Sequence, residues 1–163
     1  MSVTIFLGSD SDFEMIKEGL EILREFKVPF NLEVTSAHRS PERTVRLIKE
    51  AEEQGTKVFI AVAGKAAHLP GVVASHTILP VIGVPVEDQS LAGLDALLSI
   101  VQMPKGIPVA TVTLGKAGGV NAALLAISVL AVSDPELKDK LETYRQKMVG
   151  KVEESSRRLK EKL

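Results

Sequence analysis

The feature that most constrains the fold of this chain is a regular alternation of short apolar runs with longer amphipathic stretches. The runs are rich in β-branched residues and have the length of strands: residues 3–7, 30–35, 57–63, 80–84 and 109–113. The stretches between and after them favour helices: residues 13–26, 41–54, 69–76, 93–100 and 120–132. Three of the runs are almost wholly apolar, which is typical of parallel strands covered by helices on both faces. We therefore expect an α/β fold, a doubly wound three-layer α/β/α sandwich around a five-stranded parallel sheet.

The last part of the chain predicts one long helix that begins after Asp134, an N-cap residue followed by proline. Its apolar residues recur every three or four positions, at Leu137, Leu141, Tyr144, Met148, Val152, Leu159 and Leu163. A helix over residues 135–163 would be roughly 40 Å long and would extend beyond a domain of this size. We expect residues 1–163 to form a single catalytic domain, and this helix to pack on a neighbouring subunit of a homo-oligomer.

Composition excludes several classes of function. The chain of 163 residues has 20 basic and 21 acidic side chains, so it carries no basic field for nucleic acid or an anionic membrane surface. It contains no cysteine, which excludes disulfides, thiolate metal sites and a cysteine nucleophile. The first residues do not resemble a signal peptide, and no apolar run has the length of a membrane span. We therefore expect a cytoplasmic protein that has neither nucleic acid nor membrane as a partner.

The loop after the first predicted strand is rich in hydroxyl and carboxyl groups and precedes a helix: Gly8-Ser9-Asp10-Ser11-Asp12. Ligands of open parallel sheets bind where strands end, and hydroxyls beside a helix N-terminus can hold phosphate or ribose oxygens. Asp12 can accept hydrogen bonds from ribose hydroxyls. The alternative is that Ser11 or Asp12 only caps the helix.

The loop after the second predicted strand brings a hydroxyl, an imidazole and a guanidinium together, in Ser36-Ala37-His38-Arg39. The guanidinium of Arg39 can bind phosphate or carboxylate with two parallel hydrogen bonds. An imidazole both gives and takes a proton near neutral pH, which makes His38 the candidate acid–base residue. The alternative is a surface histidine beside an arginine that pairs with a carboxylate. Because two such loops end adjacent strands, the functional interpretation is favoured.

Two further loops carry weaker signals. After the third strand, residues 63–71 place Lys65 and His68 among small residues, where backbone can approach a flat ligand closely. We interpret His68 as a packed, hydrogen-bonded structural residue and His76 as a surface residue that ends a helix. After the fifth strand, glycines open a helix of small residues at 115–126, which favours an anion site, tight helix packing or an oligomer contact.

No cofactor is predicted. The Walker lysine and the dinucleotide-binding glycine pattern are both missing from the first loop. The histidines are widely separated and have no carboxylate at metal-ligand spacing, so no metal site is predicted. A triad of Ser9, His38 and Asp12 is conceivable, but the chain lacks a nucleophile-elbow motif.

Six ordered motifs of this sequence resemble the PurE family. They are GSDSD (8–12), SAHR (36–39), AAHLPG (66–71), LPVIGVPV (79–86), LLSIVQMPKGIPVAT (97–111) and GKAGGVNAALLA (115–126). The resemblance extends to about Val132 and implies a flavodoxin-like fold and a homo-octamer with sites at subunit contacts. It further implies the N5-carboxyaminoimidazole ribonucleotide mutase of purine biosynthesis, an enzyme that moves a carboxylate from an exocyclic nitrogen to ring carbon 4.

The resemblance also assigns roles to individual residues. His38 resembles the general acid–base, which protonates the carbamate nitrogen and later removes the proton from carbon 4. The positions that resemble substrate-binding residues are Ser9, Ser11, Asp12, Ser36, Ala37, Arg39, Gly64, Ala66 and Leu69. Lys65 departs from the mutase pattern, which has a glycine at this position, and a bulky residue here resembles the related carboxylases.

Two other functions remain as alternatives. The first is a carboxylase that acts directly on aminoimidazole ribonucleotide and carbon dioxide. The second is a non-catalytic module that senses a nucleotide or sugar phosphate on a flavodoxin-like frame, and His38 counts against it because binding needs no titrating group. A receiver-type signalling domain fits less well, because no aspartate ends the third predicted strand.

Overall fold

The computed structural model describes residues 2–88 and 91–163. Its core is a parallel five-stranded sheet in the order β2-β1-β3-β4-β5. The strands are β1 (Ser2–Leu7), β2 (Phe30–Val34), β3 (Thr56–Ala63), β4 (Val81–Pro85) and β5 (Ala110–Thr111). The helices are the 3₁₀ helix η1 (Asp10–Asp12), α1 (Phe13–Glu25), α2 (Pro41–Glu53), α3 (Leu69–Ser75), α4 (Leu94–Val101), α5 (Gly115–Ala131) and α6 (Pro135–Lys160). The flavodoxin-like α/β/α prediction is therefore confirmed.

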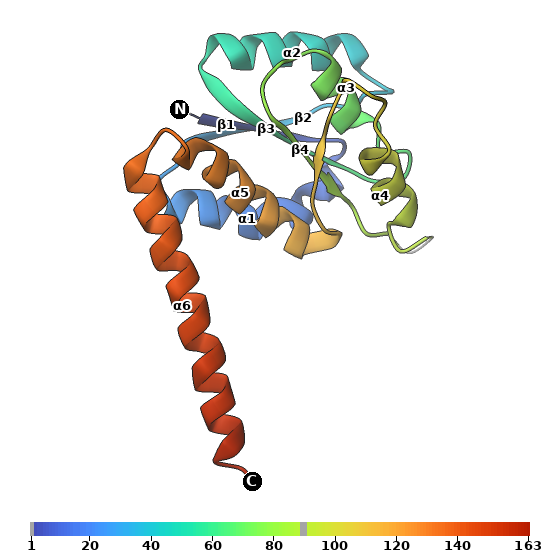
Figure 1. Cartoon of the computed structure of the whole chain (residues 1–163). Helices are drawn as coiled ribbons and strands as arrows, with labels where there is room; N and C mark the ends of the chain where they lie inside the picture. Colours follow the sequence, from blue (N-terminus) through green and yellow to red (C-terminus); the bar gives the residue numbers. More distant parts are fainter. Residues whose placement is uncertain (1, 89–90) are drawn as a thin grey trace.

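Helices cover both faces of the sheet, as Figure 1 shows. On one face, α1 and α5 pack over side chains such as Ile5 and Ile60, which are paired in register on β1 and β3. On the other face, α2, α3 and α4 cover Phe6 and Phe59, whose rings stack 5.7 Å apart. The central strands are apolar on both sides because each side has its own core.

The two outermost strands differ from the central ones. Strand β2 lies at one edge and is only partly buried, so its sequence alternates more than that of β1 or β3. Strand β5 lies at the other edge and spans only Ala110–Thr111, so the predicted strand over residues 109–113 was too long.

Helix α5 begins at Gly115, five residues before the predicted start at Val120. Glycine has a low intrinsic helix propensity, but here tertiary packing overrides it. Gly118 and Gly119 are buried, and α5 packs closely on α1. The small-residue face, which includes Ala122 and Ala126, is fully buried inside the chain. Tight helix packing is thus confirmed for this face, and its buried residues are not accessible for an oligomer contact.

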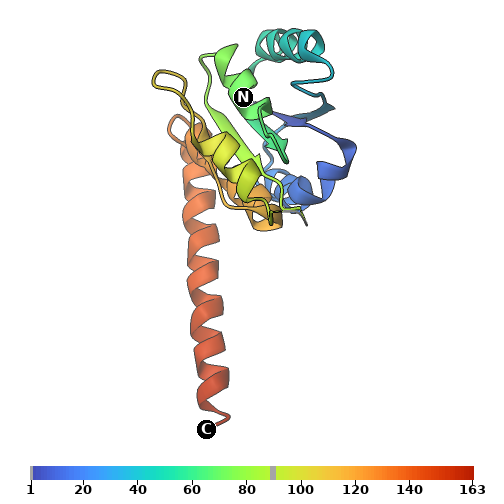
Figure 2. The same ribbon diagram turned by 90° about the vertical axis from the view of Figure 1, so that its right-hand side faces the viewer.

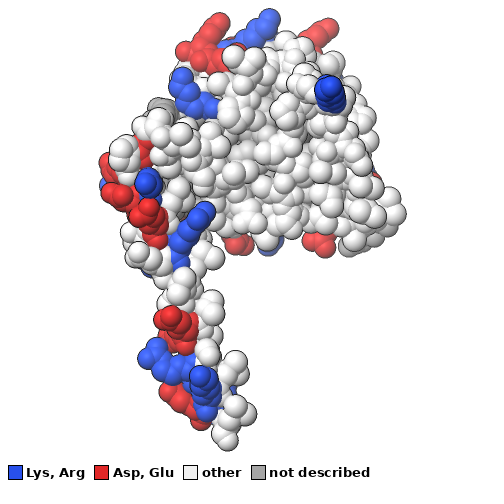
Figure 3. All heavy atoms as spheres, viewed as in Figure 1, with Lys and Arg blue, Asp and Glu red and all other residues white. Residues whose placement is uncertain are grey.

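Helix α6 leaves the body of the molecule (Figures 1 and 2). The Asp134 carboxylate caps its start by accepting a hydrogen bond from the Leu137 N–H at 3.2 Å. Leu137, Leu141 and Tyr144 pack on the core under α1 and α5, and every residue from Arg145 onward is exposed. Lys, Arg, Asp and Glu side chains gather along this helix, whereas the face of the body seen in Figure 3 carries few of them. Among the described helices, none is both long and apolar enough to cross a membrane.

Candidate active site

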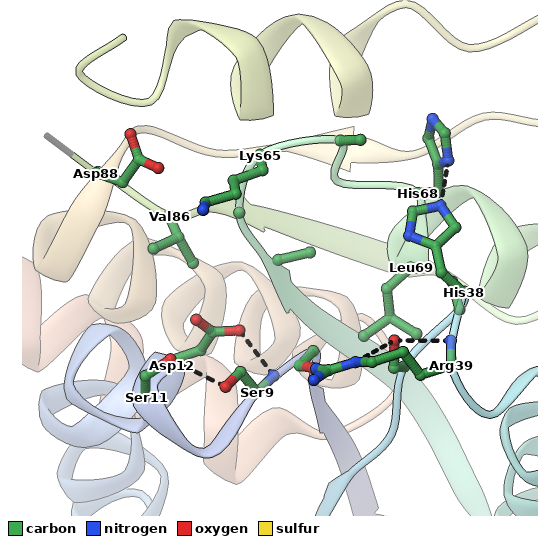
Figure 4. A pocket seen from close by; sticks show the side chains of 16 residues that line it. Ser9, Ser11, Asp12, His38, Arg39, Lys65, His68, Leu69, Val86 and Asp88 are labelled. Atoms are coloured by element: carbon green, nitrogen blue, oxygen red, sulfur yellow. Dashed lines mark hydrogen bonds between the residues drawn. The ribbon is translucent and has the colours of Figure 1, made fainter. Parts of the chain in front are cut away.

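A cavity of about 570 Å³ lies at the carboxyl ends of β1, β2, β3 and β4. This is the size of a small-molecule site, and it lies where the strand order switches between β1 and β3. The structure brings every sequence-predicted site residue to this one cavity (Figure 4): Ser9, Ser11, Asp12, Ser36, Ala37, His38, Arg39, Gly64, Ala66 and Leu69.

The loop after β1 presents a chain of polar groups to the cavity. The Ser9 N–H donates to Asp12 Oδ2 at 3.0 Å, which holds the turn closed. The Ser11 hydroxyl donates to Ser9 Oγ at 3.0 Å, and the Ser9 hydroxyl donates to Asp10 Oδ1 at 3.1 Å. Asp12 thus stabilises the start of the helical segment, as the capping interpretation predicted, and it also lines the cavity.

Asp12 is a buried carboxyl group, with 8% of its surface exposed. This burial raises the pKa of Asp12 above its ordinary value of 3.8. Hydrogen bonds from Ser9 and Ser11 and the charge of Arg39 lower the same pKa, but they do not cancel the effect of burial. A buried carboxylate that already holds its own loop is a rigid acceptor for hydroxyl groups of a ligand.

The loop after β2 is held in place by hydrogen bonds of serine and threonine hydroxyl groups. Thr35 is buried and its hydroxyl hydrogen-bonds that of Thr44 at 2.8 Å, while the Ser36 N–H donates to Ser40 Oγ at 3.0 Å. Arg39 then reaches across to β1, where Nη2 donates to the Gly8 carbonyl at 3.1 Å. This contact places the guanidinium beside the Ser9 and Ser11 hydroxyls, in an arrangement suited to a phosphate group.

His38 meets His68 across the cavity. The His38 Nε2 and His68 Nδ1 atoms are 2.7 Å apart, and the rings are close to perpendicular, at 77°. At this distance one ring must donate an N–H and the other must accept it. The interpretation of His68 as a packed residue was therefore wrong, because it is exposed in the cavity, although it is hydrogen-bonded as expected. His76 is exposed at the end of α3, as predicted.

The loop after β3 forms the opposite wall. Gly64 lies against Val86, and a Cβ atom on this glycine would approach the Val86 Cβ to 3.2 Å. Lys65 follows with a φ of 57°, a left-handed conformation that costs a non-glycine residue about 1–2 kcal/mol. Ala67 is buried and Leu69 begins α3, so this wall is fixed by packing on the core.

Sequence reasoning missed some of the lining residues. Val86 and Asp88 follow β4 and border the cavity. Val86 ends the LPVIGVPV motif, to which no site role was assigned, and Asp88 lies beyond this motif. The position of β4 beside β3 was the available signal, because carboxyl ends of neighbouring parallel strands meet at one edge. Ser9, His38 and Asp12 do not form a triad, because Ser9 Oγ donates to Asp10 and His38 is bonded to His68.

Within residues 2–88 and 91–163, no group of three or more histidine, aspartate or glutamate side chains is close enough to hold a metal ion. The groups that the cavity does offer are hydroxyls, a guanidinium, an ammonium, the carboxyl groups of Asp12 and Asp88, and paired imidazoles. These groups bind anions and move protons.

The strand order and the position of the cavity define a flavodoxin-like α/β protein whose chemistry lies at the carboxyl ends of its strands. The model of the AIR carboxylase family matches residues 2–151, and the chain belongs to this family. This result confirms the resemblance to PurE.

Curated relatives agree with this assignment. The N5-carboxyaminoimidazole ribonucleotide mutase of Pyrococcus horikoshii is 56% identical over 98% of this chain and 89% of its own length. The mutase of Bacillus subtilis is 52% identical over 96% of this chain and 97% of its own. Among solved structures, Treponema denticola PurE superposes with a TM-score of 0.88 at 31% identity, covering 96% of this chain and 97% of that one.

Proposed function

We propose that this chain converts N5-carboxyaminoimidazole ribonucleotide to 4-carboxy-5-aminoimidazole ribonucleotide in purine biosynthesis, with His38 as general acid and base. The curated mutases that match nearly the whole chain support the reaction. The observation that carries the role of His38 is its position in the cavity, bonded to a second imidazole and opposite an anion-binding loop.

Every bond that breaks or forms between heavy atoms in this reaction belongs to the substrate. One nitrogen–carbon bond breaks, one carbon–carbon bond forms, and one proton moves from carbon 4 to the exocyclic nitrogen. His38 donates a proton to the carbamate nitrogen, which releases carbon dioxide. Ring carbon 4 attacks the trapped carbon dioxide, and His38 then takes the proton from that carbon. A cavity that keeps carbon dioxide beside the ring makes recombination faster than escape.

The pairing of His38 with His68 supports this double role. A single group that acts first as acid and then as base must change its protonation state twice in each turnover. The 2.7 Å contact holds the His38 ring in one orientation in both states, because His68 Nδ1 can accept or donate according to its tautomer.

The remaining lining residues are assigned by their chemistry. Arg39 with the hydroxyls of Ser9, Ser11 and Ser36 binds the phosphate. Asp12 accepts hydrogen bonds from the ribose hydroxyls. The flat ring lies against Ala37 of the loop after β2 and, on the opposite wall, against Gly64, Ala66 and Leu69.

The test is the ultraviolet assay with N5-carboxyaminoimidazole ribonucleotide in the absence of ATP, metal and added bicarbonate. We expect rapid formation of the carbon-4 carboxylate, and a loss of about 10²–10⁴-fold in kcat for His38→Asn, the usual contribution of a general acid–base residue. Calorimetry of this variant should still detect binding of the product.

His76→Asn is the matched control, because His76 is exposed and lies outside the cavity lining. This variant should keep wild-type turnover. Near-wild-type turnover of His38→Asn, with nucleotide still bound, would make the assigned role wrong. If the wild-type chain reacts only with aminoimidazole ribonucleotide and bicarbonate, the carboxylase alternative replaces the mutase.

We also infer that the chain forms a homo-oligomer, an octamer by resemblance to the PurE family, with α6 packed on a neighbouring subunit. The exposed apolar side chains Met148, Val152 and Leu159 on α6 support this inference, as do Leu94 and Leu98 on α4. We place the protein in the cytoplasm because its substrate carries an ionised phosphate, which does not cross a bilayer unaided.

A further inference from the structure

Lys65 combines a strained backbone with a position in the active-site cavity. Its φ of 57° lies in the left-handed region, which a glycine would adopt without strain. The Lys65 carbonyl accepts a hydrogen bond from the Ala67 N–H at 2.8 Å, so the strained residue forms a tight turn at the end of the β3 loop. Non-glycine residues held in this conformation are concentrated at functional sites, which makes the side chain the point of interest.

The Lys65 side chain extends into the cavity. Figure 4 shows its amino group on the same side of the cavity as Val86 and Asp88, away from the His38–His68 pair. It lies in the loop after β3, whereas Arg39 lies in the loop after β2 and is held by the Gly8 carbonyl and the Ser36 hydroxyl. The two cations therefore approach the cavity from different walls.

The charges that line the cavity make Lys65 important for binding an anion. Among the described lining residues, the lysine and arginine side chains are those of Lys65 and Arg39, and the acidic side chains are those of Asp12 and Asp88. Without Lys65, one arginine would face two acidic groups. The ribonucleotide carries a phosphate with about −1.5 to −2 charges and, before and after the reaction, a carboxylate. A cavity with a net negative lining would repel this ligand.

We propose that Lys65 is a substrate-binding residue whose ammonium group binds an oxyanion of the ribonucleotide, either the phosphate or the carboxylate. This inference rests on the proposed function for the identity of the ligand. It explains why a lysine occupies a backbone position that suits glycine: the charge is needed at this point of the cavity.

The test is calorimetric binding of aminoimidazole ribonucleotide and of its carbon-4 carboxylate to the wild type and to three variants. Lys65→Met keeps the length of the side chain and removes the charge, and we expect Kd to rise about tenfold, the effect of one charge-assisted hydrogen bond. Lys65→Arg should restore most of the affinity. Lys65→Gly should lose affinity as Lys65→Met does, while its melting temperature rises because glycine adopts this backbone conformation without strain. The two measurements therefore separate the effect of the charge on binding from the effect of the backbone on stability.

Salt provides a readout that a purely structural role would not change. The Kd of the wild type should rise between 50 and 200 mM sodium chloride, and this rise should be smaller in Lys65→Met because one ion pair is missing. Lys57→Met is the matched control, since Lys57 is an exposed lysine near the opposite end of the same strand. This control should bind with wild-type affinity.

The two ligands distinguish the two oxyanions. An equal loss of affinity for both ligands assigns Lys65 to the phosphate, and a loss confined to the carbon-4 carboxylate assigns it to the carboxylate. If Lys65→Met has the same Kd values and the same salt dependence as the wild type, the inference about Lys65 is wrong. The proposed function still stands in that case if the wild type converts its substrate. Failure of the wild type to bind either ligand overturns both.

Discussion

Asp12 has two opposing effects on stability: its hydrogen bond stabilises a loop, and the burial of its charge lowers the free energy of unfolding. Its carboxyl group fixes the Ser9 turn, yet burial raises its pKa above the ordinary value. A group whose pKa is higher in the folded than in the unfolded state binds more protons when folded. Its favourable contribution is therefore complete below the unfolded-state pKa and is lost as the pH rises through the folded-state pKa.

We accordingly predict that Asp12→Asn is more stable than the wild type at neutral pH. The amide oxygen can still accept the Ser9 hydrogen bond, and no charge has to be buried. The advantage in melting temperature should shrink as the pH falls toward 3.8, where the wild-type carboxyl becomes neutral. The same variant should bind the ribonucleotide more weakly. A melting-temperature difference that is independent of pH between 3 and 8 would show that charge burial is not the cause.

At the scale of single residues, the sequence was informative wherever a motif ended a strand. Ser9, His38 and Arg39 lie together because parallel strands bring their carboxyl ends to one edge, a rule that needs no coordinates. His68 was misjudged because its apolar neighbours indicate burial of the segment, and they do not determine which way one side chain points. Asp88 was missed because a loop without a motif gives no local signal.

At the scale of elements, the contact between α1 and α5 shows what the glycines of the last motif do. A Cβ atom on Gly119 would lie 1.9 Å from the Met15 carbonyl oxygen, and one on Gly19 would lie 2.4 Å from the Gly119 carbonyl oxygen. Both contacts are far below van der Waals distance, so the two helix backbones touch at these glycines. Sequence alone left helix packing, anion binding and an oligomer contact as alternatives here, because small residues permit all three.

We predict that Gly119→Ala destabilises the fold by about 2–3 kcal/mol, since the methyl group forces α1 and α5 apart. For a chain of this length, this corresponds to a fall of roughly 5–10 °C in melting temperature. Gly150→Ala is the matched control, because Gly150 lies in α6 with nothing near its Cβ position. There alanine should stabilise the helix by up to about 1 kcal/mol. Equal stability of the two variants would contradict the close contact.

The boundaries of the elements were predicted less well than their order. The hydrophobic pattern predicted the described strands and α-helices in their correct order, because hydrophobic periodicity depends on many residues at once. It did not predict the short 3₁₀ helix η1. The start of α5 and the length of β5 depend on a few glycines and on edge pairing, where local propensity competes with tertiary contacts. The right-handed crossover rule then limited the topologies of the sheet to very few.

At the scale of the whole molecule, α6 packs on the core only through its first turns, and every residue from Arg145 onward is exposed. It spans 26 residues, and its exposed part begins after Tyr144, whose ring packs against Phe26 at 5.8 Å. Met148, Val152 and Leu159 continue the apolar stripe that the buried Leu137 begins. The stripe is interrupted at Ser155 and resumes at Leu159. Its extension beyond the body of the molecule indicates a second apolar surface for it to contact, and in the homo-oligomer that we infer a neighbouring copy of the chain supplies this surface.

We predict that the wild type has a molar mass in solution that is a multiple of 17.5 kDa, eightfold for an octamer. Val152→Glu should weaken the assembly by roughly 2 kcal/mol for each contact, because an apolar side chain of this size loses its burial and a charge replaces it. Gln146→Glu adds the same charge on the opposite side of α6 and should leave the molar mass unchanged. Light scattering after size-exclusion chromatography measures both variants, and circular dichroism checks that each remains folded. A wild-type chain that stays at 17.5 kDa across micromolar concentrations would show that α6 is a solvated helix, and the partner surface would then have to be abandoned.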